Sequence, residues 1–332
     1  MTGYDLVTVG RVNMDLYSRD IGAAFEDVTS FDAMVGGSPT NIAIATSRLG
    51  LRSVALTAVG DDRVGDFVLR YLRDEGVETA FIPRKAGKLT SLALLGVQPP
   101  DHFPLSFYRE DPADIHLTVD DAAAVPYDEV RAVQLSGNAV SRGSGADAAL
   151  WVAAEADRRG LVSFVDLDLR PTEWPDPADY GRALRPVLPT TDVVIGTEEE
   201  FYAALMPDPS TVMDGGPVPD EDHDTLDQRA TALLDEGVST IVLKRGPRGA
   251  TVVTADERLD VDGFPVEVVN TVGAGDAFAS GLIRSRLTGL GWYESVRYAN
   301  ACGAIEVTRH GCASAFPTHD EVMTFADERG GL

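Results

Sequence analysis

The chain has 332 residues, of which 44% are hydrophobic and 24% are charged. This composition is ordinary for a globular protein and excludes a disordered chain, a collagen and a disulfide scaffold. Acidic residues outnumber basic residues by 53 to 28, so the formal net charge is −25. Because such a surface repels polyanions, we expect neither nucleic acid nor a membrane as a partner.

The N-terminal residues and the two cysteines indicate a cytoplasmic protein. Residues 1–10 show no basic segment followed by an apolar one, so no signal peptide is expected. No apolar run reaches the length of about 18 residues that a membrane-spanning helix needs. Cys302 and Cys312 lack C-x-x-C spacing and a neighbouring His/Cys cluster, so we expect reduced thiols.

The spacing of apolar residues predicts strands that alternate with helices along most of the chain. In chain order, strands are expected over residues 4–9, 53–59, 132–135, 161–165, 192–195 and 240–243, and helices over 39–49, 64–75, 146–159, 177–188, 198–205, 225–235 and from the turn at 273 through 287. Ser38 is the expected N-cap of the first helix. Such alternation predicts a three-layer α/β sandwich, with a mainly parallel central sheet between helices.

Two segments interrupt this alternation. Residues 16–35 and 89–117 contain β-type runs with no helix between them. We interpret them as insertions that form a small β lid over one edge of a single domain, residues 1–332. Exposed edges of such a sheet often pair, so a homodimer through the lid is expected.

The strongest chemical signal is the run Gly273-Ala274-Gly275-Asp276 at the start of a helix. The two glycines leave backbone N–H groups uncovered, and the helix N-terminus favours an anion there. Asp276 could be a simple dipole-stabilising residue. The functional interpretation makes it a general base that takes a proton from an alcohol while the N–H groups stabilise a transferring phosphoryl group.

A second signal precedes the first helix. The pair Gly36-Gly37 would let a substrate approach the backbone, and Asn41 could bond hydroxyl groups. Asp15 follows the first strand and could accept two hydrogen bonds from a diol. An ordinary turn remains the alternative at both places.

Other nucleotide motifs are absent or incomplete. Lys88 follows a glycine, but the residues around it do not form a Walker A motif. Gly143 and Gly145 match a dinucleotide fingerprint, but five residues separate the first of these glycines from the strand end, where the fingerprint requires a tight turn. A dinucleotide enzyme therefore stays an alternative that binding of NAD against ATP would test.

Together, the early Gly36-Gly37…Asn41 and the late Gly273-Ala274-Gly275-Asp276 resemble the two signatures of the ribokinase-like (pfkB) carbohydrate kinases. The resemblance spans nearly the whole chain and implies an α/β sandwich with a β lid that phosphorylates a sugar hydroxyl with ATP. It implies that Asp276 is the catalytic base. The implied anion hole is Gly273, Ala274 and Gly275, and the implied sugar contacts are Asp15, Gly37 and Asn41.

The resemblance also implies a nucleotide and magnesium side. The implied ATP contacts are Thr197, Lys244, Gly246, Gly249 and Asn300, and Glu200 would organise Mg2+ through water. Thr197 stands where the family often has Asn. Asn270 stands where the late signature usually begins with an Asp that helps to hold a monovalent cation, which leaves potassium dependence open.

Two arginines indicate the class of substrate. Arg109 follows a strand of the expected lid and Arg170 follows a core strand. Arginine binds carboxylates in a bidentate manner, so this pair suits a sugar acid. The segments around both arginines resemble the 5-dehydro-2-deoxygluconokinase branch of the family, which acts in inositol breakdown. A 2-keto-3-deoxygluconate kinase, a fructokinase and a non-catalytic sugar sensor remain alternatives.

Overall fold

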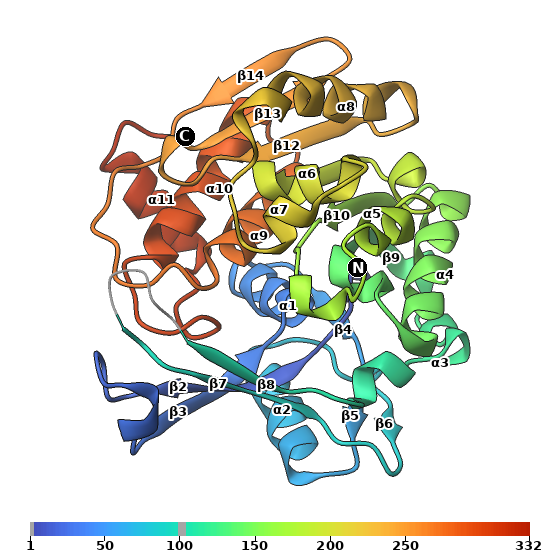
Figure 1. The fold of residues 1–332 in the computed structure, drawn as a ribbon, viewed down its shortest axis with the longest axis vertical. Coiled ribbons are helices and arrows are strands. Elements are labelled where there is room, and N and C mark those ends of the chain that lie inside the picture. Colours follow the sequence, from blue (N-terminus) through green and yellow to red (C-terminus); the bar gives the residue numbers. More distant parts are fainter. Residues whose placement is uncertain (1–2, 99–103) are drawn as a thin grey trace.

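The fold is that of a computed structural model, which describes residues 3–98 and 104–332 (Figure 1). Eight strands form the main sheet in the order β14-β13-β12-β11-β10-β9-β1-β4. Their bounds are β1 Tyr4–Val9, β4 Ser53–Leu56, β9 Val130–Ser136, β10 Val162–Asp166, β11 Val193–Thr197, β12 Thr240–Lys244, β13 Ala250–Thr254 and β14 Arg258–Val261. All neighbours from β12 to β4 pair in parallel, whereas β13 is antiparallel to both of its neighbours. The predicted mainly parallel sheet is confirmed.

Helices cover both faces of this sheet. They are α1 Ser38–Arg48, α2 Arg63–Asp74, α3 Val119–Ala123, α4 Gly143–Arg159, α5 Asp179–Leu184, α6 Glu198–Leu205, α7 Ser210–Met213, α8 His223–Asp235, α9 Ala274–Leu287, α10 Trp292–Glu306 and α11 His319–Asp327. Because successive strand residues point to opposite faces, each strand contributes to two cores. Leu6 packs in the cluster that contains α9 and α10, whereas Val7 packs in the cluster that contains α4.

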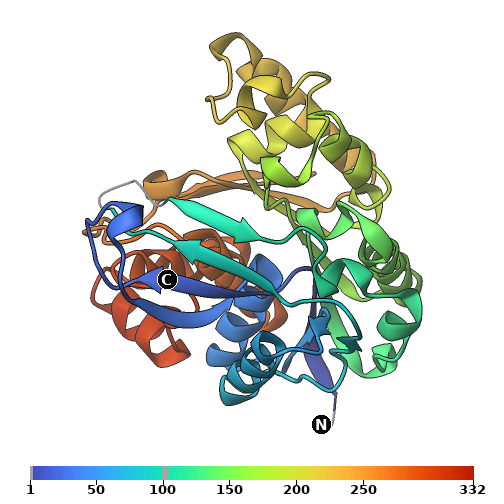
Figure 2. The ribbon, with the colours of Figure 1, turned by 60° about the horizontal axis from the view of Figure 1, so that its bottom comes forward.

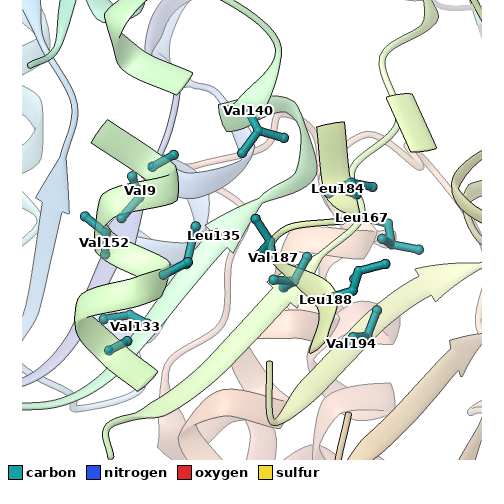
Figure 3. Close-up of a cluster of buried hydrophobic side chains, with 14 of the residues drawn as sticks. Val9, Val133, Leu135, Val140, Val152, Leu167, Leu184, Val187, Leu188 and Val194 are labelled. Atoms are coloured by element: carbon teal, nitrogen blue, oxygen red, sulfur yellow. The ribbon is translucent and has the colours of Figure 1, made fainter. Parts of the chain in front are cut away.

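The core on the α4 side is built from branched aliphatic residues. In Figure 3, Val133 and Leu135 from β9 meet Val152 from α4, and Leu167 and Val194 lie in the same cluster. Each fully buried side chain of this size contributes about 1.5–3 kcal/mol to folding. This packing holds the carboxyl ends of the parallel strands at one edge of the sheet, where open α/β folds bind their ligands.

A smaller sheet lies beside the main one, with the strand order β3-β2-β7-β8. Its strands are β2 Asn13–Ser18, β3 Phe31–Gly36, β7 Ser91–Leu95 and β8 Leu105–Tyr108, and they come from the two segments that interrupt the helix–strand alternation. In Figures 1 and 2 this sheet forms a separate layer along one side of the molecule, next to α2. Within the second segment, residues 99–103 lie outside the described residues.

Three local predictions were wrong in detail. The first helix is capped by Gly37, which has a φ of 101°, and not by Ser38. The strand expected over 53–59 ends at Leu56, and a separate short strand β5, Val59–Gly60, pairs with β6, Arg84–Lys85. The helix expected over 177–188 is shortened to α5, since Pro186 has no N–H group to continue the helical hydrogen bonds. Within the described residues, no helix is both long and apolar enough to cross a membrane.

Candidate active site

The first turn of α9 lies beside the carboxyl end of β12. A Cβ atom built on Gly275 would lie 3.6 Å from the Nζ atom of Lys244 and would meet nothing else within 4 Å. The N–H groups of a first helical turn have no partner within the helix. Gly275 therefore leaves room for an anion beside this turn, whereas Ala274, the first residue of the helix, donates its N–H to Thr271 O at 3.4 Å.

Asp276 is held between the first turns of α1 and α9. Its Oδ1 atom accepts a hydrogen bond from Ser38 Oγ at 2.6 Å, and its Oδ2 atom accepts one from Asn41 Nδ2 at 2.8 Å. Burial and the charge of Asp168 raise the pKa of Asp276 to about 6, although the two hydrogen bonds lower it. At neutral pH this carboxylate is ionised and more basic than an exposed aspartate, which suits a general base.

Side chains from α10 and the chain that follows it support the turn before α9. The Asn270 amide donates to Gly311 O at 2.8 Å and accepts from the backbone N–H of Val272 at 3.0 Å. Gly273 has a φ of 103°, and a Cβ there would lie 2.8 Å from Oε1 of Glu306. Burial and the charge of Asp276 raise the pKa of Glu306 well above its usual range. A glycine is therefore required at position 273 both by conformation and by space.

Asp15 occupies a pocket that two glycines make possible. A Cβ on Gly36 would overlap the carboxylate of Asp15, and a Cβ on Gly37 would lie 2.6 Å from Arg11 O. Asn13 Nδ2 donates to Asp15 Oδ1 at 2.7 Å. Burial raises the pKa of Asp15 to about 6, against the lowering effects of the Asn13 amide and the Arg11 charge. Gly36 thus makes room for a side chain of the protein, whereas the sequence analysis had assigned that space to a ligand.

A buried charge cluster lies at the ends of β10 and β12. Lys244 Nζ is 3.1 Å from Asp166 Oδ1 and 3.3 Å from Glu200 Oε2. Burial alone would lower the pKa of Lys244, but the charges of Asp166 and Glu200 raise it. Burial raises the pKa of Asp166, although Lys244 lowers it. Glu200 also accepts from the backbone N–H of Thr197 at 2.8 Å and so closes a capping box at the start of α6.

This cluster fits a magnesium ion that is bound mostly through water and phosphate. Among the described residues, no group of three or more His, Cys, Asp or Glu side chains is arranged to hold a metal ion directly. Mg2+ commonly takes one or two carboxylates and fills its other positions with water and substrate phosphates. Glu200 and Asp166 supply two carboxylates of this kind beside the open turn of α9.

The two arginines that the sequence analysis selected are both paired with carboxylates. Arg109 Nη1 lies 2.7 Å from Asp114 Oδ2, and Arg109 Nε lies 2.8 Å from Glu173 Oε1. Arg170 Nη2 lies 2.7 Å from Asp168 Oδ1. Arg109 is almost fully buried in its pairs, whereas Arg170 keeps 43% of its side chain exposed. Of the two, Arg170 has the more accessible donors.

Asp168 connects Arg170 to the main sheet under backbone strain. Its Oδ2 atom accepts from Ser136 Oγ at 2.6 Å. Its φ of 38° is in the left-handed region, which costs about 1–3 kcal/mol for a residue other than glycine and recurs at functional sites.

The segment predicted to contact the nucleotide is a tight turn between β12 and β13. Arg245 donates its backbone N–H to Gly249 O at 2.8 Å. A Cβ on Gly249 would overlap Val261 O, whereas a Cβ on Gly246 would meet nothing within 4 Å. The amide of Asn300 donates to Val261 O at 3.3 Å and to Asp262 O at 3.1 Å. Gly249 and Asn300 therefore shape the turn, and Gly246 leaves an open approach to it.

Two further site residues were not found from the sequence. Ser38 was assigned to capping, yet its hydroxyl group bonds Asp276. Arg11 lies on the turn after the first strand and is buried close to Asp15. The available signal was their place next to predicted site residues, since Ser38 follows the glycine pair and Arg11 follows Gly10 at a strand end.

The dinucleotide alternative finds no support in the geometry. A Cβ on Gly143 would overlap Ile115 O, and one on Gly145 would lie 2.9 Å from Asp114 O. These two glycines make room for close packing of the backbone.

Comparison with known proteins shows the family of this chain. A model described as pfkB family carbohydrate kinase matches residues 4–319. The chain belongs to this family and is a carbohydrate kinase. It is 31% identical to the 5-dehydro-2-deoxygluconokinase of Geobacillus thermodenitrificans over 97% of this chain and 92% of that one. It is 30% identical to the protein of the same name from Clostridium perfringens, with the same coverage.

Solved structures agree on the fold. A PfkB protein from Polaromonas sp. JS666 has a TM-score of 0.77 at 26% identity and covers 94% of this chain and 98% of its own. A fructokinase with bound ATP from Xylella fastidiosa has a TM-score of 0.82 at 23% identity, with 98% of both chains covered. The ribokinase-like architecture predicted from the sequence is confirmed.

Proposed function

We propose that this kinase transfers the γ-phosphoryl group of ATP to a hydroxyl group of a sugar acid, 5-dehydro-2-deoxy-D-gluconate. The observation that carries the proposal is Asp276. Two hydrogen bonds orient this carboxylate beside the open first turn of α9, and burial raises its pKa to about 6. The relatives named 5-dehydro-2-deoxygluconokinase support the choice of substrate.

The proposed reaction is an in-line displacement. The substrate hydroxyl group gives its proton to Asp276 while its oxygen bonds to the γ-phosphorus of ATP. The bond from that phosphorus to the bridging oxygen breaks, and ADP leaves with the electron pair. The N–H groups of Gly273, Ala274 and Gly275 are assigned to the charge on the transferring group. Ser38 and Asn41 fix the direction in which the base faces.

On the substrate side, we assign Asp15, Gly37 and Asn41 to the sugar hydroxyl groups. Asn41 Oδ1 is buried and has no hydrogen-bond partner among the described residues, so it can accept from a hydroxyl group. The positive charge near Arg109 and Arg170 suits an acid better than a neutral sugar.

On the nucleotide side, we assign Lys244, Gly246, Gly249, Asn300 and Thr197 to ATP. Glu200 would hold Mg2+ through water, and the ion would supply positive charge to the phosphates. A candidate ribokinase II from E. coli of the same fold, with a TM-score of 0.85 at 24% identity, is known in complex with ATP and Mg2+.

Release of ADP with a panel of substrates tests this function. The panel is 5-dehydro-2-deoxygluconate, 2-keto-3-deoxygluconate, fructose and ribose. We expect the highest kcat/KM for 5-dehydro-2-deoxygluconate. Turnover of fructose alone would support the fructokinase alternative, which the fold of the Xylella protein also fits. Sugar binding without any turnover would indicate a sensor.

We further propose that the small sheet is a lid over the sugar and that its edge joins two copies of the chain. Its edge strand β8 exposes Leu105 and Tyr108, and unpaired strand edges readily pair with another edge. Sedimentation of the protein with Leu105→Lys tests this: we expect a dimer in the unsubstituted protein and a monomer in the variant.

Two other assignments are part of the proposal. Asn270 is neutral and its amide is used within the turn, so we infer that turnover does not depend on potassium. Equal rates in potassium and in tetramethylammonium buffer would support this. A cytoplasmic location fits the use of ATP and the two free, buried thiols, and fractionation of cells tests it.

A further inference from the structure

Arg11 is a buried arginine that has neither an ion pair nor a side-chain hydrogen bond among the described residues. It lies on the turn that follows β1, and only 7% of the residue is exposed. Its Nε atom is buried without a hydrogen-bond acceptor, and its guanidinium group forms no ion pair with any residue in the ranges 3–98 and 104–332. Its Cζ atom lies 5.3 Å from the centroid of the Phe107 ring on β8.

The neighbouring arginines are arranged differently. Arg109 is shared by Asp114 and Glu173, and Arg170 is paired with Asp168. Arginine cannot lose its proton in a protein, so Arg11 must keep its positive charge in this buried position. A buried charge without a partner is costly. Among these three arginines, Arg11 is therefore the one without an ion pair to any described residue.

The position of Arg11 connects it to the sugar pocket. The residue is four positions from Asp15, and its carbonyl oxygen lies against Gly37, where a Cβ would come within 2.6 Å. Its charge lowers the pKa of Asp15. Its ring contact is with the small sheet that we propose as the lid. By contrast, the buried cation at the α9 turn is Lys244, which is paired with Asp166 and Glu200.

We propose that Arg11 binds the carboxylate of the sugar acid and so sets the preference of this kinase for acids over neutral sugars. A carboxylate could accept two hydrogen bonds from the guanidinium N–H groups of Arg11 and would neutralise the charge of that side chain. A neutral sugar would leave that charge buried and unpaired, so it would bind less well. This inference rests on the proposed function, and it assigns the recognition of the acid to a residue other than Arg109, whose donors are already used.

Variants of Arg11 test the assignment by kinetics. Arg11→Met keeps most of the length of the side chain and removes its charge. Arg11→Lys keeps the charge but lacks the planar guanidinium group that makes bidentate hydrogen bonds. We expect Arg11→Met to raise KM for 5-dehydro-2-deoxygluconate about 10- to 100-fold, with a smaller effect for Arg11→Lys. KM for fructose and KM for ATP should change by less than about twofold. The matched control is Arg19→Met, because Arg19 is an exposed arginine near the same sheet that pairs with Asp32.

A thermal measurement separates recognition from folding. Without substrate, Arg11→Met should melt no lower than the unsubstituted protein, since it removes an unpaired buried charge. Addition of 5-dehydro-2-deoxygluconate without ATP should raise the melting temperature of the unsubstituted protein and of Arg19→Met, but not that of Arg11→Met.

The outcomes are distinct. An equal rise in KM for the acid and for fructose, or a fall in the melting temperature without ligand, would give Arg11 a structural role and overturn the inference. A selective rise in KM for ATP would assign it to phosphate and also overturn it. If the unsubstituted protein turns over fructose and no acid, the proposed substrate itself is wrong. If the acid is turned over equally by Arg11→Met, only the role of Arg11 is refuted.

Discussion

The substitution Asp276→Asn tests the general base with little disturbance of its surroundings. Ser38 Oγ can still donate to the amide oxygen of the new Asn, as it does to the carboxylate at 2.6 Å. Asn41 now donates to the second carboxylate oxygen, and its own Oδ1 atom is buried without a partner. Rotation of the Asn41 amide would turn that oxygen toward the new NH2 group. The variant should therefore fold and bind sugar.

Two opposite effects of known size follow from the structure. Loss of the base should reduce kcat by about 10²- to 10⁴-fold. The same substitution should stabilise the fold. Burial raises the pKa of Asp276 from 3.8 to about 6, so the ionised form costs up to about 3 kcal/mol at pH 7.5, at roughly 1.4 kcal/mol for each pKa unit. With an unfolding entropy of about 0.7 kcal/mol per K for a chain of this length, that is a rise in melting temperature of up to about 4 °C.

The sign of the pH dependence follows from linkage. A carboxyl group with a raised pKa in the folded state destabilises the protein above that pKa, and the cost disappears below the pKa of the unfolded chain. The gain in free energy of unfolding for Asp276→Asn should therefore fall to about half at pH 5. The assays are ADP release, sugar binding by calorimetry and urea unfolding at both pH values. The exposed Asp256→Asn is the control. A kcat within about tenfold of the unsubstituted enzyme would refute the assignment of the base.

Three further outcomes follow from the site. A plot of log(kcat/KM) against pH should fall below about pH 6 with a slope steeper than one, because the pKa values of Asp15 and Asp276 are both raised to about 6. A decrease that begins only near pH 4 would contradict the raised pKa values. Gly36→Ala would place a Cβ on the Asp15 carboxylate, so calorimetry should show the loss of sugar binding, and retained affinity would remove Asp15 from the pocket. Lys244→Met leaves Asp166 unpaired, so urea unfolding at pH 8 should show a free energy of unfolding lower by about 3 kcal/mol. The loss should be smaller at pH 5, where the raised pKa of Asp166 lets its carboxyl group protonate. Equal losses at the two pH values would contradict this explanation.

Much of the secondary structure could be predicted because it depends on local patterns. The strand over Tyr4–Val9 and the helix α6 begin and end where the sequence predicts them. The motif at Gly273–Asp276 could also be found, since an anion site at a helix N-terminus needs small residues in consecutive positions. The prediction was wrong where a residue distant in the sequence intervenes. Serine is a common N-cap residue, but the hydroxyl group of Ser38 donates to Asp276, which is 238 positions away in the sequence.

The sequence by itself therefore determined the class of fold and the family and led to the proposed base, because each depends on a run of adjacent residues or on a short-range period. Only the tertiary structure decided which charged side chains form ion pairs and which do not. Arg109 and Arg11 cannot be told apart by composition, since both follow strands and both become buried. The fold brings Asp114 and Glu173 into ion pairs with Arg109, whereas Arg11 has no ion pair among the described residues. Electrostatic pairing depends on distances in space, and those distances exist only once the sheets and helices have packed.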